Sequence, residues 1–241
     1  YLGQLYYADK LEQNAIPNYE YVIDQPKNEF TEQALVRLSE TYLKAEQYAK
    51  AVPVLEKLKD AADYPQNKTF AQANLMKSYY NLKEYPKAVS AAEVVLQNPK
   101  IEDKVKADAQ IIIARAAFQS GDEVKAKAAY AKLQTIAKGE LAAEALYYDV
   151  YFKNKEGKFE DSNKAVQKLT KDYSGYRYYG AKALVVMAKN FYGLKDSFNA
   201  TYILENVVKN FTEFEDVTAE AKAELEKITA EEAKTNSSVK E

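Results

Sequence analysis

The 241-residue sequence contains no histidine and no cysteine. Without histidine there is no Ser-His-Asp triad and no imidazole that titrates near neutral pH. Without cysteine there is no thiolate nucleophile, no disulfide and no Cys/His zinc site. No Gly-x-Gly-x-x-Gly or Gly-Lys-Ser/Thr motif, which would cradle a phosphate, occurs either. The composition argues against most enzyme chemistry, and we expect a non-catalytic protein without a metal or cofactor.

Charge and hydropathy narrow the class of protein further. The 34 Lys and Arg residues nearly balance the 36 Asp and Glu residues, for a net charge of -2. A near-neutral chain offers no electrostatic footprint for nucleic acid or anionic lipid. Apolar residues make up 47%, as in folded globular proteins, but no apolar run is long enough to cross a bilayer. We expect a folded protein with no nucleic-acid partner and no transmembrane segment in this chain.

A small residue recurs along the chain inside segments with helical spacing. The intervals are about three dozen residues, close to the periods of helix-turn-helix repeats, and the positions are Ala15, Ala51, Ala88, Ala126, Ser162 and Ala200. Seven residues after each comes an aliphatic residue, namely Val22, Leu58, Val95, Leu133, Leu169 and Val207. A small side chain lets two antiparallel helices approach closely, and the aliphatic residue fills the remaining space. The pattern predicts about six helix pairs.

The fifth copy of this repeat departs from the pattern. The same register places Asp149 and Lys153 at core positions, where burial would penalise their charges. A shift by one residue turns Tyr148 and Phe152 inward instead, which implies one extra residue in the following turn. The other tyrosines at repeat positions are interpreted as packing residues: Tyr6, Tyr42, Tyr48, Tyr79 and Tyr85.

The order and spacing of these residues resemble the tetratricopeptide repeat family. The first copy shows the match best, with Leu2-Gly3, Tyr6, Ala15, Tyr19 and Val22. The resemblance implies an all-α, right-handed superhelical solenoid of antiparallel helix pairs over residues 1–233. A capping helix from about Val217 to Ala233 would cover the last pair with a stripe of Ala221, Leu225 and Ile228. Residues 234–241 are polar, and we expect a frayed tail there.

Two finer resemblances concern the cellular location. Helix ends such as Asp63-Tyr64-Pro65 are similar to the envelope branch of this family in Gram-negative bacteria, which includes outer-membrane assembly lipoproteins. The stretch from Ala142 to Ala233 is similar to the carboxyl end of long repeat proteins from Bacteroidetes. These resemblances imply the periplasm or cell envelope, with the cytoplasm as the alternative. Because Tyr1 opens directly into an amphipathic pattern, we also expect a fragment or a processed chain.

The family resemblance implies that the first helix of each pair lines a concave groove that binds a partner. At the lining positions, three copies place a cation three residues before an aromatic residue, on one helix face: Lys77 and Tyr80, Arg115 and Phe118, Lys189 and Tyr192. Such a groove suits a protein or peptide segment with acidic and apolar side chains. The alternative is that these aromatics only pack against neighbouring helices while the cations face water.

Tyrosine is abundant, with 21 residues, and tryptophan is absent. Secondary candidates for partner contact are Tyr147, Tyr151, Tyr178 and Tyr179. They leave open a carbohydrate-binding repeat module that stacks sugars on aromatic rings, although the lack of tryptophan argues against it. A third alternative is a purely architectural segment of a longer chain, with self-association possible. Carboxylate pairs such as Glu140 and Glu144 are interpreted as solvated helix faces.

Overall fold

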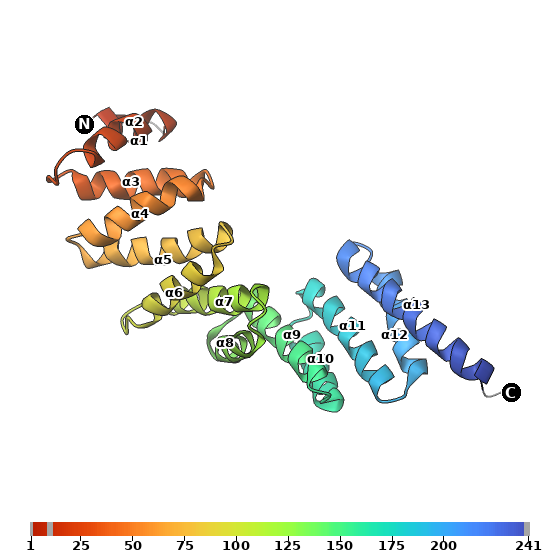
Figure 1. The fold of residues 1–241 in the computed structure, drawn as a ribbon. Coiled ribbons are helices and arrows are strands. Elements are labelled where there is room, and N and C mark those ends of the chain that lie inside the picture. Colours follow the sequence, from red (N-terminus) through yellow and green to blue (C-terminus); the bar gives the residue numbers. More distant parts are fainter. Residues whose placement is uncertain (1, 9–11, 239–241) are drawn as a thin grey trace. The chain divides into compact units, whose positions relative to one another are not determined.

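The computed structural model describes residues 2–8 and 12–238, and this part of the chain forms α-helices without any strand. The all-α helical-repeat fold is confirmed (Figure 1). The helices are α1 (Leu2–Ala8), α2 (Glu12–Ile23), α3 (Thr31–Lys44), α4 (Tyr48–Ala61), α5 (Pro65–Asn81), α6 (Tyr85–Leu96), α7 (Asp103–Gln119), α8 (Glu123–Ile136), α9 (Glu140–Lys155), α10 (Phe159–Asp172), α11 (Arg177–Gly193), α12 (Ser197–Asn210) and α13 (Glu215–Ser238).

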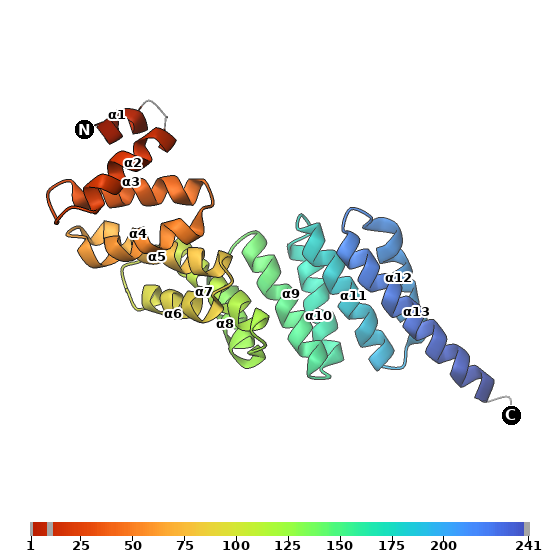
Figure 2. The ribbon, with the colours of Figure 1, turned by 45° about the horizontal axis from the view of Figure 1, so that its top comes forward.

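The chain divides into two compact units, Tyr1–Ala129 and Tyr130–Glu241. Within each unit, helices that follow one another in sequence pack side by side, as α3, α4, α5 and α6 do in the N-terminal unit (Figure 2). The first helix of a pair also contacts the first helix of the next pair. Examples are α5 with α7, α9 with α11 and α11 with α13. The single repeat domain of residues 1–233 stays a prediction.

The recurring small residues lie at the centre of the helix pairs. Their side chains are completely buried in every copy: Ala15, Ala51, Ala88, Ala126, Ser162 and Ala200. The aliphatic residues seven positions later are buried as well from the second copy onward, whereas Val22 is half-buried. Any larger side chain at the small position would force the paired helices apart. The sequence period thus marks the close contact within each pair.

The turn inside a helix pair repeats one backbone geometry. One residue of the turn adopts a left-handed conformation, with φ between 54° and 79°, at Glu46, Lys83, Gly121, Gly157 and Lys195. The next residue then donates its N–H to a carbonyl five residues earlier, for example Glu84 to Tyr79 at 2.9 Å and Asp122 to Ala117 at 2.9 Å. This Schellman arrangement satisfies a carbonyl at the end of the first helix. Glycine avoids the steric cost of a positive φ at two of the five turns.

The fifth repeat accommodates two charged residues, Asp149 and Lys153, at positions where the other repeats have core residues. Phe152 is buried and Val150 is completely buried, but the predicted one-residue shift is wrong. The turn has no extra residue, because Gly157 with its positive φ stands five residues before Ser162, as Gly121 stands five residues before Ala126. Asp149 and Lys153 avoid the core by forming an ion pair of 2.7 Å at its edge. Tyr148 is only half-buried, with its ring stacked on Tyr130 at a centroid distance of 3.9 Å.

Two packing assignments need correction. Tyr42 and Tyr79 are buried and Tyr48 and Tyr85 are half-buried, but 36% of Tyr6 is exposed, because α1 has only seven residues and buries little. Glu144 is not on a solvated face, since only 3% of it is exposed. Its carboxylate accepts hydrogen bonds from the hydroxyls of Tyr130 and Tyr179, which compensates for its burial.

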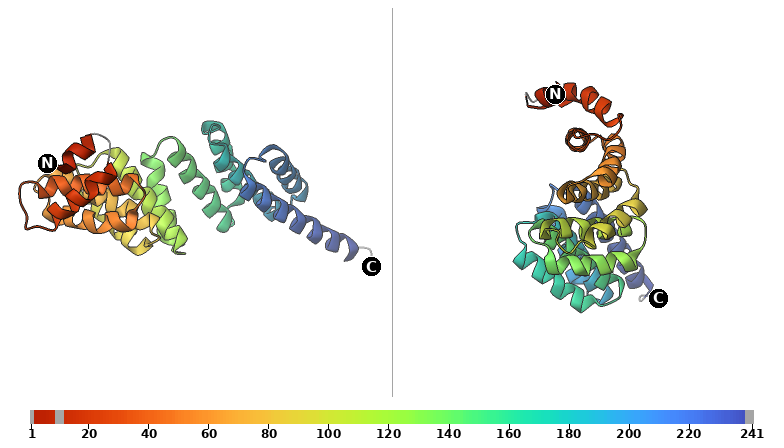
Figure 3. Two further views of the ribbon diagram at one scale, coloured as in Figure 1. Left: turned by 90° about the horizontal axis from the view of Figure 1, so that it is seen from above. Right: turned by 90° about the vertical axis from the view of Figure 1, so that its left-hand side faces the viewer.

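The last helix covers the end of the C-terminal unit. The helix α13, the darkest blue one, packs against α11 and α12 (Figure 3). Val217, Ala221 and Ile228 are buried in one hydrophobic cluster with Val185 of α11 and Leu204 of α12, and Leu225 packs against that cluster. An amphipathic helix at this place shields apolar surface that the last helix pair would otherwise expose. α13 begins two residues before the predicted start and continues to Ser238, into the segment where fraying was expected.

Candidate functional site

Each of the six predicted groove residues lies on the first helix of a pair, four of them in the N-terminal unit and two in the C-terminal unit. Lys77 and Tyr80 are on α5, Arg115 and Phe118 on α7, and Lys189 and Tyr192 on α11. We call the outward side of α1, α3, α5 and α7 in the N-terminal unit, and of α9, α11 and α13 in the C-terminal unit, the first-helix face. All six side chains are half-buried. They therefore combine accessible surface with contacts inside the protein.

Lys77 is bonded to the next first helix. Its ammonium lies 2.5 Å from the carboxylate of Asp108 on α7, with 44% of the Lys77 side chain and 22% of the Asp108 side chain exposed. The ring of Tyr80 lies 5.8 Å from that of Tyr85 in a tilted arrangement. Arg115 and Phe118 likewise interact with other groups of the chain. A partner would meet side chains that already hold the repeats together.

Lys189 repeats this arrangement in the C-terminal unit. Its ammonium lies 2.7 Å from Glu220 and 3.4 Å from Glu224, both on α13. Burial by itself lowers the pKa of Lys189, but the hydrogen bond and the charge of Glu220 outweigh that effect and raise it. The hydroxyl of Tyr192 donates a 2.5 Å hydrogen bond to Glu231, which raises the pKa of Tyr192 to about 12. Lysine and tyrosine thus anchor α13 onto α11.

The secondary tyrosine candidates form a cluster across α9, α11 and α13. Tyr147 is buried, and its ring lies 6.2 Å from that of Tyr179, which in turn lies 5.4 Å from Tyr178. Tyr178 also contacts Phe214 and donates a 2.7 Å hydrogen bond to Asp216. These rings pack on one another, which leaves less ring surface for stacking on a sugar. The fourth candidate, Tyr151, lies at the edge of the cluster and contacts Tyr148 and Phe152.

Lys182 completes this cluster and was missed in the sequence. Its ammonium lies 4.8 Å from the centroid of the Tyr147 ring and 5.4 Å from that of Tyr178, within the range of a cation–π interaction. The side chain is half-buried on α11, one turn after Tyr178. Among the residues that the structure describes, Lys182 has no carboxylate partner. The i,i+4 spacing of Tyr178 and Lys182 was a usable signal.

The other cations on α11 differ from Lys182 in this respect. Lys189 has the carboxylates of α13, and Arg177 lies 2.7 Å from Glu213. A half-buried ammonium that contacts only aromatic rings keeps its charge incompletely compensated. The rings of Tyr147 and Tyr178 restrict the motion of the Lys182 side chain at the same time.

Other kinds of site find no support in the described chain. Within residues 2–8 and 12–238, no group of three or more acidic side chains is arranged to hold a metal ion. None of the described helices combines the length and apolar character of a membrane span.

Comparisons with known proteins agree with the helical-repeat architecture. A family model described as tetratricopeptide repeat matches residues 33–66, which comprise most of α3, all of α4 and the first residues of α5. No curated protein matches the chain in sequence. The Rap protein complexed with competence and sporulation factor is a similar solved structure, with 16% identity, a TM-score of 0.48 and coverage of 96% of this chain and 74% of that chain.

The tetratricopeptide repeat domain of P58(IPK) is also similar, with 13% identity, a TM-score of 0.43 and coverage of 97% of this chain and 64% of that chain. The family match falls on a helix pair whose buried small residue, Ala51, recurs in equivalent form along the chain. Tetratricopeptide repeats are protein-interaction modules. Residues 33–66 are therefore identified as a tetratricopeptide repeat, a helix pair of the kind that occurs in scaffolds for protein–protein interaction.

Proposed function

We propose that the chain is a non-catalytic scaffold that binds an acidic and apolar segment of a partner protein on the first-helix face. The groove residues would be Lys77, Tyr80, Arg115 and Phe118 in the N-terminal unit and Lys189 and Tyr192 in the C-terminal unit. The principal anchor in the C-terminal unit would be Lys182 between Tyr147 and Tyr178. The observation that carries this proposal is the half-buried ammonium of Lys182 in contact with two aromatic rings.

A carboxylate of the partner would complete the surroundings of Lys182. A charge-assisted hydrogen bond to an ionised group contributes about 1.5–3 kcal/mol. Because the rings of Tyr147 and Tyr178 already hold the ammonium, binding costs less side-chain entropy than at a fully exposed lysine. Apolar side chains of the partner would lie against the accessible parts of Tyr178 and Tyr151. The first-helix face therefore favours a segment in which carboxylates alternate with apolar residues.

Lys77 and Lys189 have a different role in this proposal. Each already neutralises a carboxylate of the next first helix, so a partner's carboxylate competes with Asp108 or Glu220 for it. Reversing either charge would also place two negative groups side by side inside the protein. Variants at these two lysines consequently test the fold together with binding. Lys182 separates the two effects, since its replacement breaks no ion pair within the described structure.

The experiment is affinity capture from envelope and cytoplasmic extracts with wild type, Lys182→Glu and Lys168→Glu. Lys168 is an exposed lysine on the second helix α10 of the same unit and serves as the matched control. A protein captured by wild type and Lys168→Glu but lost with Lys182→Glu supports the proposal. The extract that contains it tests the envelope location implied by the family resemblance.

Two results would contradict the proposal. Equal capture by all three forms would show that binding does not involve Lys182, and the absence of any captured protein would favour an architectural segment. Circular dichroism and thermal unfolding of each variant verify that the fold is unchanged.

A further inference from the structure

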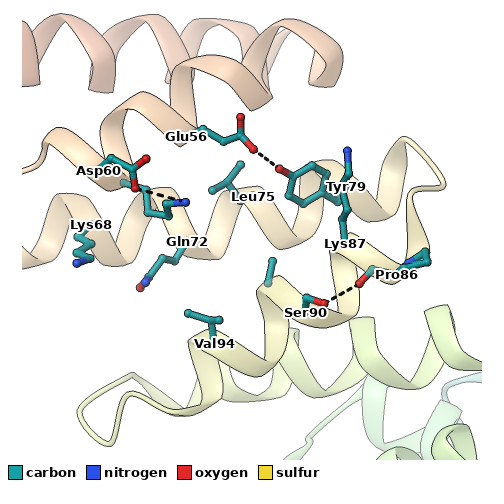
Figure 4. Close-up of a pocket in the computed structure, with 12 residues that line it drawn as sticks. Glu56, Asp60, Lys68, Gln72, Leu75, Tyr79, Pro86, Lys87, Ser90 and Val94 are labelled. Carbon is teal, nitrogen blue, oxygen red and sulfur yellow. Dashed lines mark hydrogen bonds and ion pairs between the residues drawn. The ribbon is translucent and has the colours of Figure 1, made fainter.

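The second helices of the N-terminal unit enclose a cleft on the side away from the first-helix residues discussed above. It has a volume of about 630 Å³ and lies between α4, α5 and α6 (Figure 4). Leu75 and Tyr79 of α5 line its floor, and Pro86 and Ser90 of α6 line one wall. We call it the α4–α6 cleft. A similar cleft of about 500 Å³ lies one repeat earlier, between α2, α3 and α4.

One tyrosine of a first helix lines each of these clefts, Tyr79 in the α4–α6 cleft and Tyr42 in the cleft one repeat earlier. In the α4–α6 cleft, the Tyr79 hydroxyl donates a 2.5 Å hydrogen bond to Glu56 of α4, and the Lys87 ammonium of α6 lies 5.4 Å from the ring centroid (Figure 4). The ring therefore stands between the acid of one second helix and the lysine of the next. One repeat later, Ala117 takes the place of the tyrosine, and Lys125 of α8 forms a direct 2.8 Å ion pair with Glu93 of α6.

The wall of the α4–α6 cleft and an exposed ridge in the C-terminal unit occupy the same repeat positions. Two residues before and two after the buried alanine of the repeat stand Pro86 and Ser90 on α6, which are small and leave space. The corresponding residues on α12 are Phe198 and Tyr202, which are 78% and 58% exposed. Phe198 and Tyr202 are four residues apart on one helix, so the two exposed aromatic side chains are neighbours. One unit thus has a hollow where the other has a protrusion.

The cleft and the exposed aromatic residues of α12 also have side chains of opposite charge beside them. Lys68 lines the α4–α6 cleft, is exposed and has no ion pair among the residues that the structure describes. Glu205 follows Tyr202 by three residues on α12, so it lies on the same side of that helix. Glu205 is exposed and, within the described chain, also lacks an ion pair. We call Phe198, Tyr202 and Glu205 the α12 ridge.

We propose that the chain associates with a second copy of itself, by docking the α12 ridge of one copy into the α4–α6 cleft of the next. Phe198 and Tyr202 would cover Leu75 and Tyr79, and Glu205 would pair with Lys68. A cleft of this volume lies in the range that holds a drug-sized ligand, so it accommodates two aromatic side chains. The interface is small and the association is accordingly weak.

The geometry of this contact determines the kind of assembly. Ridge and cleft are different surfaces, so the contact is heterologous and each copy keeps one unused ridge or cleft for a further copy. Association therefore continues into an open chain or closes into a ring, of which the smallest is a reciprocal dimer. The cleft is lined by none of the groove residues Lys77, Tyr80, Arg115 and Phe118, so the contact does not cover them directly. This proposal therefore stands independently of the partner-binding proposal.

Sedimentation equilibrium over a wide concentration range tests the proposal. We expect the average mass of the wild type to rise with concentration above that of the monomer. The double variant Phe198→Ser, Tyr202→Ser should weaken association by at least about tenfold, as for a truncated hot spot, and Ser90→Trp should do the same by filling the cleft. Val124→Ser is the matched control, because Val124 occupies the position of Phe198 on α8 and is 84% exposed.

Two further experiments test whether the ridge and the cleft bind each other specifically. A mixture of the ridge variant and the cleft variant has one intact surface on each chain, so it should form dimers and nothing larger. Lys68→Glu and Glu205→Lys should each weaken association, and the chain with both changes should regain it. A wild type that stays monomeric at every concentration would overturn the proposal and leave the cleft to another partner. Association that the ridge and cleft variants do not change would overturn it too.

Discussion

Lys189 on α11 and Glu220 on α13 are 31 residues apart in the sequence, and their charged groups lie 2.7 Å apart. Lys77 on α5 and Asp108 on α7 have the same separation of 31 residues and a distance of 2.5 Å. Each unit therefore uses a lysine of one first helix and a carboxylate of the next to align consecutive repeats. The first-helix face, which we propose binds a partner, is thus also an internal interface between repeats.

The alignment by Lys189 can be measured with a double-mutant cycle. Lys189→Glu should lower the free energy of unfolding by about 1 kcal/mol or somewhat more, since a partly exposed pair contributes up to about that amount and the new charge faces Glu220 and Glu224. Glu220→Lys should also destabilise, and the charge-swapped double variant should recover most of the loss. Urea unfolding gives the three values. Strictly additive losses would show that the two side chains do not interact.

The buried small residue can be tested within one helix. Ala126 is completely buried on α8, whereas Ala128 on the same helix is exposed. Ala126→Leu should destabilise the protein by about 1–3 kcal/mol or more, because the added methylenes force the paired helices apart. Ala128→Leu should change the free energy of unfolding by less than about 0.5 kcal/mol. Equal effects of the two substitutions in chemical denaturation would refute the role given to the repeat period.

Glu32 provides a capping interaction between two repeats. Only 8% of this residue is exposed, and its carboxylate accepts hydrogen bonds from the N–H groups of Asp63 and Tyr64 and from the side-chain amide of Asn67 at the start of α5. Glu32→Ala leaves these donors without their ionised acceptor. We expect a loss of about 2–3 kcal/mol in the free energy of unfolding.

The control for the cap is Glu29→Ala, which removes an exposed carboxylate from the same region. Amide hydrogen exchange should show faster exchange at the start of α5 in Glu32→Ala only. Unchanged protection there would mean that the hydrogen bonds of Glu32 are not what fixes this helix end.

Tyr42 should contribute a pH dependence in the alkaline range. Burial, together with the hydrogen bond to Glu20, raises the pKa of Tyr42 to about 12, compared with about 10 for an unperturbed tyrosine. Between these two values the unfolded chain has lost the proton that the folded chain still holds, so the free energy of unfolding falls as the pH rises. Below about pH 10 this contribution is fully present and constant.

Between about pH 10 and 12, Tyr42→Phe should therefore make the fall of the free energy of unfolding with pH shallower by about 1.4 kcal/mol per pH unit, which corresponds to one proton. Near neutral pH the variant should be less stable by about 1 kcal/mol, the worth of the lost hydrogen bond. Urea titrations at a series of alkaline pH values measure both. A slope identical to that of the wild type would show that Tyr42 titrates normally in the folded protein.

The sequence predicts the parts of this fold that follow from local periodicity. The spacing of Ala51, Ala88 and Ala126 predicts which residues meet inside a helix pair, because those contacts join neighbouring segments of the chain. The shift predicted for the fifth copy is wrong, because the turn keeps its length and Asp149 and Lys153 pair with each other at the edge of the core. The irregular start of the chain is less predictable, and Tyr6 is exposed where packing was expected.

The interactions within the candidate site could be predicted from the sequence only in part. Lys77 and Lys189 occupy positions on the first-helix face, but their partners Asp108 and Glu220 belong to the next repeat, so the two ion pairs were not predicted. Lys182 was missed because its importance depends on Tyr147, which reaches it from another helix. The α4–α6 cleft is lined by residues of three helices, including Tyr79, and only the structure shows that these residues enclose a space.

The central claim is that carboxylates of a partner bind at Lys182, and selection from a random peptide display library tests it most directly. Peptides selected by the wild type should be enriched in Asp and Glu among apolar residues. They should bind at least about tenfold more weakly to Lys182→Glu, the equivalent of about 1.4 kcal/mol, and equally well to Lys168→Glu. Selected peptides rich in Lys and Arg, or peptides that Lys182→Glu binds as tightly as the wild type does, would contradict the account.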